Sequence, residues 1–389
     1  MKIAVLKERA EGETRVALTP ETAKKFIALG ADVAIEAGAG EAAAISDAAY
    51  TDVGVSVGSA QEALKDAGIV LGVQAPDTAA LAGASPGAWV AATFDPFRES
   101  ARVAAYAEAG YEALSMEFMP RITRAQSMDV LSSQSNLAGY KAVLTAANTY
   151  GRAFPMMMTA AGTVQAARVF VMGVGVAGLQ AIATARRLGA KVEAYDVRPA
   201  VKEQVESLGA TFADLPLDTH DSEDTGGYAK VQDADFLTRQ REMMARVVAA
   251  SDVVITTALI PGRPAPMLVT DAMIAGMTPG AVVVDLAAER GGNVEASKPD
   301  ETVVAHGVTV LGPTNLPATV PFHASQMYAK NVSTLLLHLV DDGALQIDLE
   351  DEITQATLVS QNNEVVHPRI RDLLAKLHPQ PNGLLARSD

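Results

Sequence analysis

Short apolar runs alternate with amphipathic stretches through the first third of the chain. Each run has the length and β-branched content that are typical of buried strands; the runs occupy residues 2–6, 32–36, 68–73, 88–94 and 111–117. The stretch between the first two runs predicts a helix, because Thr19 suits the N-cap, Pro20 the first turn and Gly30 the end. Strands that alternate with helices predict a parallel α/β sheet.

The same alternation returns in the second half of the chain, after a long apolar helix that begins near residue 137. This helix leads into the triplet Met156–Met158, which we expect to pack at a domain interface. An apolar strand at 167–172, a glycine turn at 173–178 and a second strand at 190–196 form the clearest unit. Further strands are predicted at 252–257, 281–286 and 303–311. The sequence therefore predicts an α/β protein with two parallel-sheet, Rossmann-like domains and a cleft between them.

Two features of the pattern predict where the domains divide. The polar segment 214–235 is too long for an ordinary connection between a strand and a helix, which predicts a mobile surface loop. The apolar helix at 325–340 closes the second domain and returns the chain to the first. We expect a first domain of residues 1–131 and 323–389, and a nucleotide-binding Rossmann domain of residues 132–322.

Composition excludes several classes of function. The 389 residues include 31 Lys and Arg against 46 Asp and Glu, so a net charge of -15 disfavours nucleic acid as a partner. The chain has no cysteine, which excludes disulfides, zinc–thiolate sites and thiol nucleophiles. We also expect no metal site, no signal peptide and no membrane span, because no motif or apolar run of the required kind is present.

The turn "GVGVAG" has the spacing of a dinucleotide-binding loop between a strand and a helix. Gly173 permits the tight turn, Gly175 lets the backbone approach a pyrophosphate, and Gly178 allows close packing of helix and strand. Val176 and Ala177 open the helix, whose N-terminal N–H groups would face the phosphates. A structural glycine turn without a cofactor is the alternative.

The strand that follows ends in Asp196, 18 residues after the last glycine of the turn. A carboxylate there would bind a ribose diol and repel a 2′-phosphate, which favours NAD(H) over NADP(H). Val197 and Arg198 come next, and the arginine would weaken that preference. Thr257 and Ala258 end a neighbouring strand, where ligand contacts are expected in such a sheet.

The segment 120–136, "PRITRAQSMDVLSSQSN", is dense in hydrogen-bonding groups but has no histidine, cysteine or lysine. Most dehydrogenases remove a proton together with the hydride and keep a His or Lys for that purpose. All six histidines lie beyond residue 219. Hydride transfer between two nicotinamides releases no proton and needs only two rings held together with water excluded. That reaction fits a segment of this composition.

Several long blocks resemble one known family: "KERAEGETRVALTPE", "MEFMPRITRAQSMDVLSSQSNLAGYKAV", "FPMMMTAAGTVQAARVFVMGVGVAGLQAIATARRLGA", "DVRPAVKEQVESLGA", "TGGYAK" and "TTALIPGRPAP". Together they resemble the NAD(H)-binding alpha subunits of proton-translocating NAD(P) transhydrogenases, within the family shared with alanine dehydrogenase. The likeness runs from about residue 1 to residue 370.

The resemblance implies a role for four residues of the polar segment. Arg121, Gln126, Asp129 and Ser132 match the loop that positions the nicotinamide carboxamide and the ribose. The chemistry agrees, because arginine and serine donate to the carboxamide oxygen while an aspartate accepts from its NH₂. A polar helix-capping loop is the alternative for this segment.

The resemblance also implies a mobile loop and a set of partners. Gly227 and Tyr228 match a loop that folds over bound NAD(H). NADP(H) would be held by a beta subunit, and a separate membrane-spanning subunit would translocate the proton. The chain itself would form a homodimer, located in the cytoplasm on the cytoplasmic face of the inner membrane through these partners.

Two other functions stay open at the level of sequence. The first is an alanine- or opine-type amino-acid dehydrogenase on the same fold. Arg15 matches that group, but Gln74 stands where its substrate-binding lysine would be, and 91–97 has no histidine. The second is a non-catalytic NAD(H)-binding module, which would bind the cofactor without transferring hydride.

Overall fold

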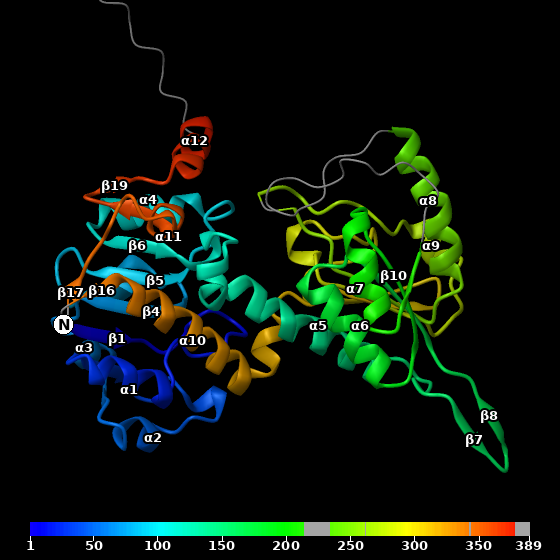
Figure 1. Cartoon of the computed structure of the whole chain (residues 1–389), viewed down its shortest axis with the longest axis horizontal. Helices are drawn as coiled ribbons and strands as arrows, with labels where there is room; N and C mark the ends of the chain where they lie inside the picture. The colour runs from blue at the N-terminus through cyan, green and yellow to red at the C-terminus, as the bar shows by residue number, and fades with distance from the viewer. Residues whose placement is uncertain (214–233, 261, 342–343, 378–389) are drawn as a thin grey trace, which may run out of the picture. The chain divides into compact units, whose positions relative to one another are not determined.

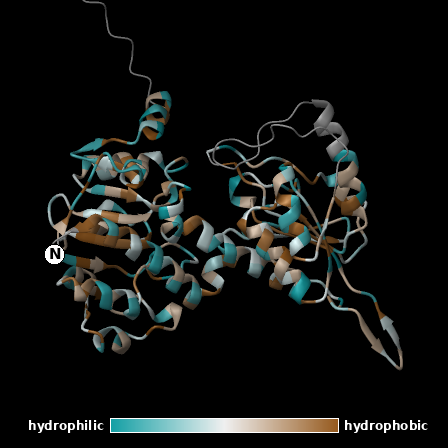
Figure 2. Ribbon diagram, viewed as in Figure 1, coloured by the Kyte–Doolittle hydropathy of each residue, from teal (hydrophilic) through white to brown (hydrophobic). Residues whose placement is uncertain are grey.

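The computed structural model describes residues 1–213, 234–260, 262–341 and 344–377, without the side chains of 234–240. The chain forms two compact units, of Met1–Ser133 with Val320–Asp389, and of Gln134–Thr319. Below they are called unit 1 and unit 2. Each contains a central sheet whose strands carry most of the hydrophobic residues (Figures 1 and 2).

Unit 1 is built on an eight-stranded sheet with the order β19-β18-β6-β5-β4-β1-β2-β3. Strands β1 to β6 pair in parallel, as the alternating pattern predicts. Strands β18 and β19 extend the sheet in antiparallel pairing, which the sequence did not predict. The strands are β1 Lys2–Val5, β2 Asp32–Glu36, β3 Ser56–Gly58, β4 Ile69–Gln74, β5 Trp89–Thr93, β6 Glu112–Ser115, β18 Leu358–Gln361 and β19 Glu364–Val365.

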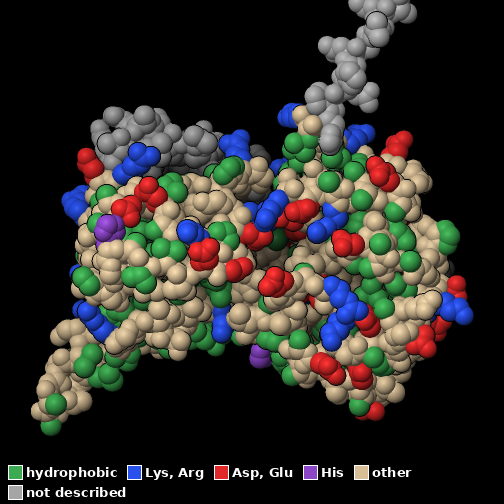
Figure 3. Space-filling model, turned by 180° about the vertical axis from the view of Figure 1, so that it is seen from behind, with side chains coloured by type: hydrophobic (Ala, Val, Ile, Leu, Met, Phe, Trp, Pro, Cys, Tyr) green, Lys and Arg blue, Asp and Glu red, His purple; other side chains and the backbone are tan. Residues whose placement is uncertain are grey.

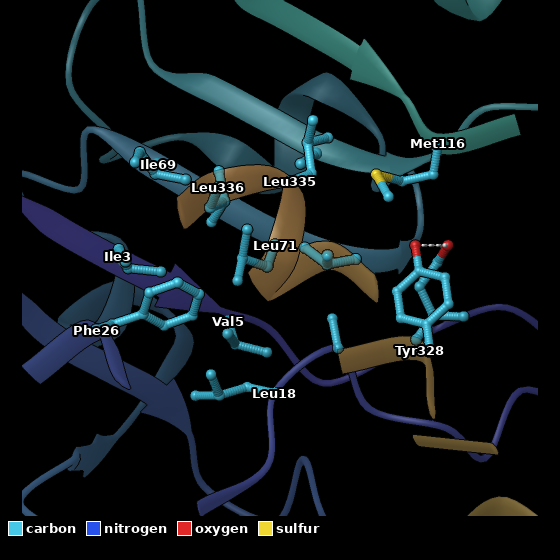
Figure 4. Packing of buried hydrophobic residues seen from close by; sticks show 14 of the residues in the cluster. Ile3, Val5, Leu18, Phe26, Ile69, Leu71, Met116, Tyr328, Leu335 and Leu336 are labelled. Carbon is cyan, nitrogen blue, oxygen red and sulfur yellow. Dashed lines mark hydrogen bonds between the residues drawn. The ribbon is translucent and has the colours of Figure 1, made fainter. Parts of the chain in front are cut away.

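Helices cover this sheet, and α10 (Pro321–Leu339) supplies part of its core. Leu335 and Leu336 of that helix lie in one buried cluster with Leu71 and Phe26 (Figure 4). The return of the C-terminal part to the first unit is therefore confirmed. The other helices of unit 1 are α1 Pro20–Ala28, α2 Asp47–Thr51, α3 Ala60–Leu64, α4 Ser100–Glu108, α11 Glu352–Thr357 and α12 Pro368–Leu377. A small pair of strands, β16 Val340–Asp341 and β17 Ala344–Leu345, follows α10.

Thr19 caps α1 as its sequence predicts. Its side chain accepts a hydrogen bond from the Thr22 backbone, and the Thr22 side chain bonds back to the cap. This reciprocal pair satisfies N–H groups that have no partner within the helix.

Unit 2 has a seven-stranded sheet with the order β11-β10-β9-β12-β13-β15-β14. All its strands pair in parallel except β14, so the α/β class with parallel sheets is confirmed. The strands are β9 Arg168–Met172, β10 Lys191–Tyr195, β11 Thr211–Phe212, β12 Val253–Thr256, β13 Val282–Asp285, β14 Thr302–Ala305 and β15 Val308–Leu311. The helices are α6 Val176–Arg187, α7 Lys202–Ser207, α8 Ala234–Ala249 and α9 Asp271–Ala275.

One predicted strand of unit 2 is wrong. The stretch 303–311 forms two antiparallel strands, β14 and β15, instead of one. The chain reverses at His306 and Gly307, which have φ angles of 53° and 78°. A left-handed pair of residues is the conformation that a tight hairpin requires. The histidine concealed this turn within an otherwise apolar stretch.

The packing predicted for Met156–Met158 is also wrong. After α5 (Val130–Thr149), these residues enter a hairpin of β7 (Met157–Thr159) and β8 (Gly162–Val164) that projects from unit 2 (Figure 1). The exposed fraction is 57% for Met156, 42% for Met157 and 77% for Met158. An apolar composition did not predict packing here, because a two-stranded hairpin without a covering layer leaves both faces open.

Candidate nucleotide-binding site

The glycine turn of unit 2 leaves no room for side chains at two of its three glycines. Gly173 has a φ of 93°, and a Cβ there would lie 2.8 Å from the Thr257 Oγ1 atom. A Cβ at Gly178 would lie 1.9 Å from the carbonyl oxygen of Gly173. The turn and the first turn of α6 therefore pack in direct backbone contact.

Gly175 differs from the other two, because a Cβ there would meet no protein atom within 4 Å. Gly175 is the N-cap of α6, and no side chain caps this helix. The N–H groups that open the helix at Val176 and Ala177 are thus suited to an anion, as at other uncapped helix N-termini. Open space and unsatisfied donors occur at the same place.

Gly139, on α5, is a residue of this region that sequence reasoning missed. A Cβ at Gly139 would lie 2.1 Å from the carbonyl oxygen of Ala177. Any other residue there would push α5 away from the start of α6. A glycine in the middle of a predicted helix was the available signal, since it lowers helix propensity without another purpose.

Asp196 lies beside the turn, but its oxygens already have partners. It accepts hydrogen bonds from the Val174 N–H at 2.7 Å and from the Arg198 N–H at 2.9 Å. The Arg198 guanidinium also donates to both carboxylate oxygens, at 2.9 Å each. Asp196 thus joins the glycine turn to the end of β10. A ribose diol would have to share the carboxylate with Arg198 or displace the guanidinium.

Thr257 and Ala258 lie next to the glycine turn, at the end of β12. The Thr257 hydroxyl donates to the Gly173 carbonyl oxygen at 2.9 Å. The Ala258 N–H donates to the side-chain oxygen of Asn293 at 3.0 Å. Sequence reasoning missed Asn293, whose only signal was the pair of glycines before it. Strands β10, β9 and β12 are neighbours, so the described residues predicted for cofactor binding in unit 2, Gly173–Gly178, Asp196–Arg198, Thr257 and Ala258, lie at one edge of the sheet.

Gly227 and Tyr228, predicted to close over the cofactor, lie outside the described residues.

In unit 1, Asp129 and Ser132 are directly bonded to each other. The Asp129 carboxylate accepts the Ser132 N–H at 2.9 Å and the Ser132 hydroxyl at 2.5 Å. Asp129 directly precedes α5, so this is the geometry of an N-cap. Arg121 and Gln126 lie just before it, and both are exposed. Gln126 belongs to a 3-10 helix, Thr123–Met128.

Asn331 of α10 holds this loop at two points. Its side-chain amide donates to the Ser127 carbonyl oxygen at 2.8 Å. Its side-chain oxygen accepts the Ser133 hydroxyl at 2.7 Å. Both ends of the stretch that contains Asp129 are therefore fixed to one helix.

A second anchor of the loop is the ion pair between Arg124 and Asp351. His338 also bonds to Asp351, with its Nε2 atom 2.9 Å from a carboxylate oxygen. Burial acts to raise the pKa of Asp351, but the hydrogen bonds from His338 and Arg124 outweigh it and lower the pKa to about 2. The loop is thus tied to α10 and to the start of α11.

The region that would bind an amino acid in a dehydrogenase is occupied by a buried network. Arg15 is 7% exposed and bonds to both carboxylate oxygens of Glu13, at 2.7 and 2.6 Å. The Gln74 amide donates to the same carboxylate at 3.2 Å. Thr93, in the run without a histidine, donates to the Gln74 side-chain oxygen at 3.3 Å. The position of the expected lysine therefore holds a neutral amide.

Neither a membrane span nor a metal cluster appears in the parts of the chain that the structure describes. No helix among them is long and apolar enough to cross a bilayer. They also contain no group of three or more His, Asp or Glu side chains that could hold a metal ion. On the face shown in Figure 3, acidic and basic side chains are intermixed.

Comparisons with known proteins agree on one family. The model of the alanine dehydrogenase/PNT N-terminal domain matches residues 4–138, and that of the C-terminal domain matches residues 142–368. An NAD(P) transhydrogenase alpha subunit of Rhodospirillum rubrum, the first of the two parts into which its name divides that subunit, is 49% identical over 379 residues, covering 95% of this chain and 99% of the relative. An alanine dehydrogenase of Halomonas elongata is 29% identical over 382 residues, covering 96% of each chain.

A solved structure gives the same result for the fold. The crystal structure of transhydrogenase from Sinorhizobium meliloti has 49% sequence identity and a TM-score of 0.86. The match covers 94% of this chain and 100% of that one. By sequence and by fold, therefore, the chain belongs to the alanine dehydrogenase/PNT family.

Proposed function

We propose that this chain is the NAD(H)-binding subunit of a proton-translocating NAD(P) transhydrogenase. The observation that carries the proposal is the near full-length likeness to a transhydrogenase alpha subunit, at much higher identity than to an alanine dehydrogenase. The network around Gln74 supports it, because the position of a substrate lysine is filled by an amide that bonds to Glu13.

Unit 2 is proposed as the nucleotide-binding domain. The pyrophosphate would lie over Gly175, where no protein atom blocks the approach and the uncapped N-terminus of α6 presents its N–H groups. Asp196 would bind the ribose and disfavour a 2′-phosphate. Thr257 and Ala258 would bound the site on the side of β12. Gly227 and Tyr228 would cover the bound cofactor.

Unit 1 is proposed to contribute Arg121, Gln126, Asp129 and Ser132 to the nicotinamide. Asp129 holds the Ser132 hydroxyl at 2.5 Å, which fixes the orientation of both side chains. When bound, the nicotinamide supplies or accepts the hydride. No residue of this chain has to move a proton, because hydride passes from C4 of one ring to C4 of the other. The work of the chain is to orient one ring and exclude water.

The partners follow from this function. NADP(H) would be bound by a beta subunit, and proton translocation would occur in a membrane-spanning subunit at the cytoplasmic face of the inner membrane. The chain would act as a homodimer. The uncharged β7–β8 hairpin, with its exposed methionines, offers a surface for a second copy.

The test is a stopped-flow assay of hydride transfer between NADH and NADP⁺. It mixes the purified chain with an NADP(H)-binding transhydrogenase subunit and includes L-alanine with NAD⁺ as a control on the chain alone. We expect fast transfer in the mixture only. Reduction of NAD⁺ by alanine would favour an amino-acid dehydrogenase instead. NADH binding without transfer in any mixture would favour a non-catalytic binding module.

A further inference from the structure

The segment that follows β12 is linked to the glycine turn through a single side chain. The Thr257 hydroxyl donates to the Gly173 carbonyl oxygen. The same carbonyl oxygen lies where a Cβ on Gly178 would collide with it. A shift of Thr257 would therefore move the turn and the start of α6 together.

Asn293 fixes this segment by pairing with the backbone of Ala258. The Ala258 N–H donates to Asn293 Oδ1 at 3.0 Å, and the Ala258 carbonyl oxygen accepts from Asn293 Nδ2 at 2.9 Å. The second hydrogen of the amide goes to the Pro266 carbonyl oxygen at 2.8 Å. Asn293 is 0% exposed, so both donors of its amide are used in a dry environment.

Two glycines and one carboxylate bring Asn293 to this place. Gly291 and Gly292 have φ angles of 97° and 80°, which other residues rarely adopt. A Cβ on Gly292 would lie 2.9 Å from an Asp285 carboxylate oxygen. That oxygen accepts the Asn293 N–H at 3.0 Å and the Val294 N–H at 3.3 Å.

Asp285 ends β13 and connects Asn293 to the sheet. It is 0% exposed, and its other oxygen accepts the Thr256 hydroxyl at 2.9 Å and the Ala287 N–H at 3.0 Å. Thr256 immediately precedes Thr257. The carboxylate thus fixes β12, and the turn that carries Asn293, to one point.

We infer that Asn293 is a positioning residue of the NAD(H) site, which sets the location of Thr257 and Ala258 against the glycine turn. The inference rests on the proposed function of unit 2. It also changes the role expected of Ala258. Because its N–H and its carbonyl oxygen both bond to Asn293, Ala258 would contact the cofactor through its apolar surface.

The experiment compares three variants of the full chain: Asn293→Ala, Asn293→Asp and Ser251→Ala. Ser251 is the matched control, since it is also buried in unit 2 and lies just before the other end of β12. Its hydroxyl donates to the Val247 carbonyl oxygen at 2.7 Å. NADH affinity is measured by fluorescence titration, and exchange of the Ala258 amide hydrogen is measured without nucleotide.

We expect Asn293→Ala to weaken NADH binding by about tenfold or more, because it leaves the buried Ala258 peptide without partners. Exchange at Ala258 should rise in this variant, whereas Ser251→Ala should keep the wild-type affinity within about twofold. Asn293→Asp turns a carboxylate oxygen toward two carbonyl oxygens. Its affinity relative to wild type should improve from about pH 8 to about pH 6, as protonation of a buried carboxyl restores one donor.

Wild-type affinity in folded Asn293→Ala would overturn the inference and leave Asn293 with a purely structural role. An equal loss in Ser251→Ala would also overturn it, because the effect would not be local to Ala258. Absence of NADH binding by the wild-type protein would overturn the proposed function and this inference together. That result is distinguishable, because the wild type itself would be silent while the Ala258 amide still reported on the contact.

Discussion

The two glycines that flank the start of α6 should respond oppositely to the same substitution. Gly178→Ala would place a Cβ 1.9 Å from the Gly173 carbonyl oxygen, so the contact must widen by about 1 Å to reach an observed separation. Overpacking of this kind costs roughly 1–3 kcal/mol, and the higher helix propensity of alanine returns at most about 1 kcal/mol. We expect a net loss of about 1–2 kcal/mol in the free energy of unfolding.

Gly175→Ala should leave stability almost unchanged. Its φ of -81° is open to any residue, and its Cβ would meet no protein atom within 4 Å. The change in unfolding free energy should lie within about 0.5 kcal/mol. The added methyl would instead occupy the space proposed for the pyrophosphate. NADH affinity should fall by about tenfold or more.

Urea denaturation and NADH titration of both variants test this pair of expectations. The slope of the denaturation curve should not change, so that the midpoint alone reports stability. The reasoning would be refuted if Gly178→Ala were as stable as wild type, or if Gly175→Ala lost stability but kept full affinity. The first result would mean that α6 can move away from the turn, and the second that the open space is not a ligand site.

Three further expectations follow from the structure. Asp129→Asn keeps a good N-cap for α5, so stability should change by less than about 0.5 kcal/mol in urea denaturation while the stopped-flow hydride-transfer rate falls; an unchanged rate would leave Asp129 a cap only. Asp196→Ala should narrow the preference for NADH over NADPH in fluorescence titrations, and an unchanged ratio would exclude Asp196 from ribose selection. The folded-state pKa of Asp351 is lowered to about 2 from 3.8. Its stabilisation is therefore present above about pH 4 and lost as the pH falls toward 2, so the unfolding free energies of wild type and Asp351→Asn should converge over that range. A constant difference would argue against the Asp351 interactions as its source.

Local patterns in the sequence predicted the parts of the fold that depend on local physics. The glycine turn was visible because Gly173 and Gly178 are required by steric contacts within a few residues of each other. The cap at Thr19 was visible for the same reason. The addition of β18 to the first sheet was not, because Leu358 pairs with Leu114, more than two hundred positions earlier. Long-range strand pairing leaves no periodic signal of its own.

The candidate site divides in the same way. Asp196 could be predicted from its distance to the turn, but its bidentate pairing with Arg198 depends on side-chain geometry that spacing does not encode. Asn293 lies 35 residues from Ala258 in the chain. Its role became apparent only when the turn at Gly291 and Gly292 placed the amide against the Ala258 peptide.

The discontinuity of unit 1 has a physical consequence for its polar loop. The loop has little apolar material of its own, since Arg121 and Gln126 are exposed and its best-buried members are Ala125 and Met128. Its shape is set from outside, by Asn331 on α10 and by Asp351 at the start of α11. Both anchors come from the stretch of chain that follows unit 2.

A first domain made of the N-terminal segment alone would therefore keep most of its sheet but lose the supports of this loop. Exposed side chains that must orient a ring need a backbone that does not move, because small displacements at a reacting centre cost large factors in rate. The return of the chain to unit 1 supplies that rigidity. The C-terminal helices thus belong to the functional argument as much as to the fold.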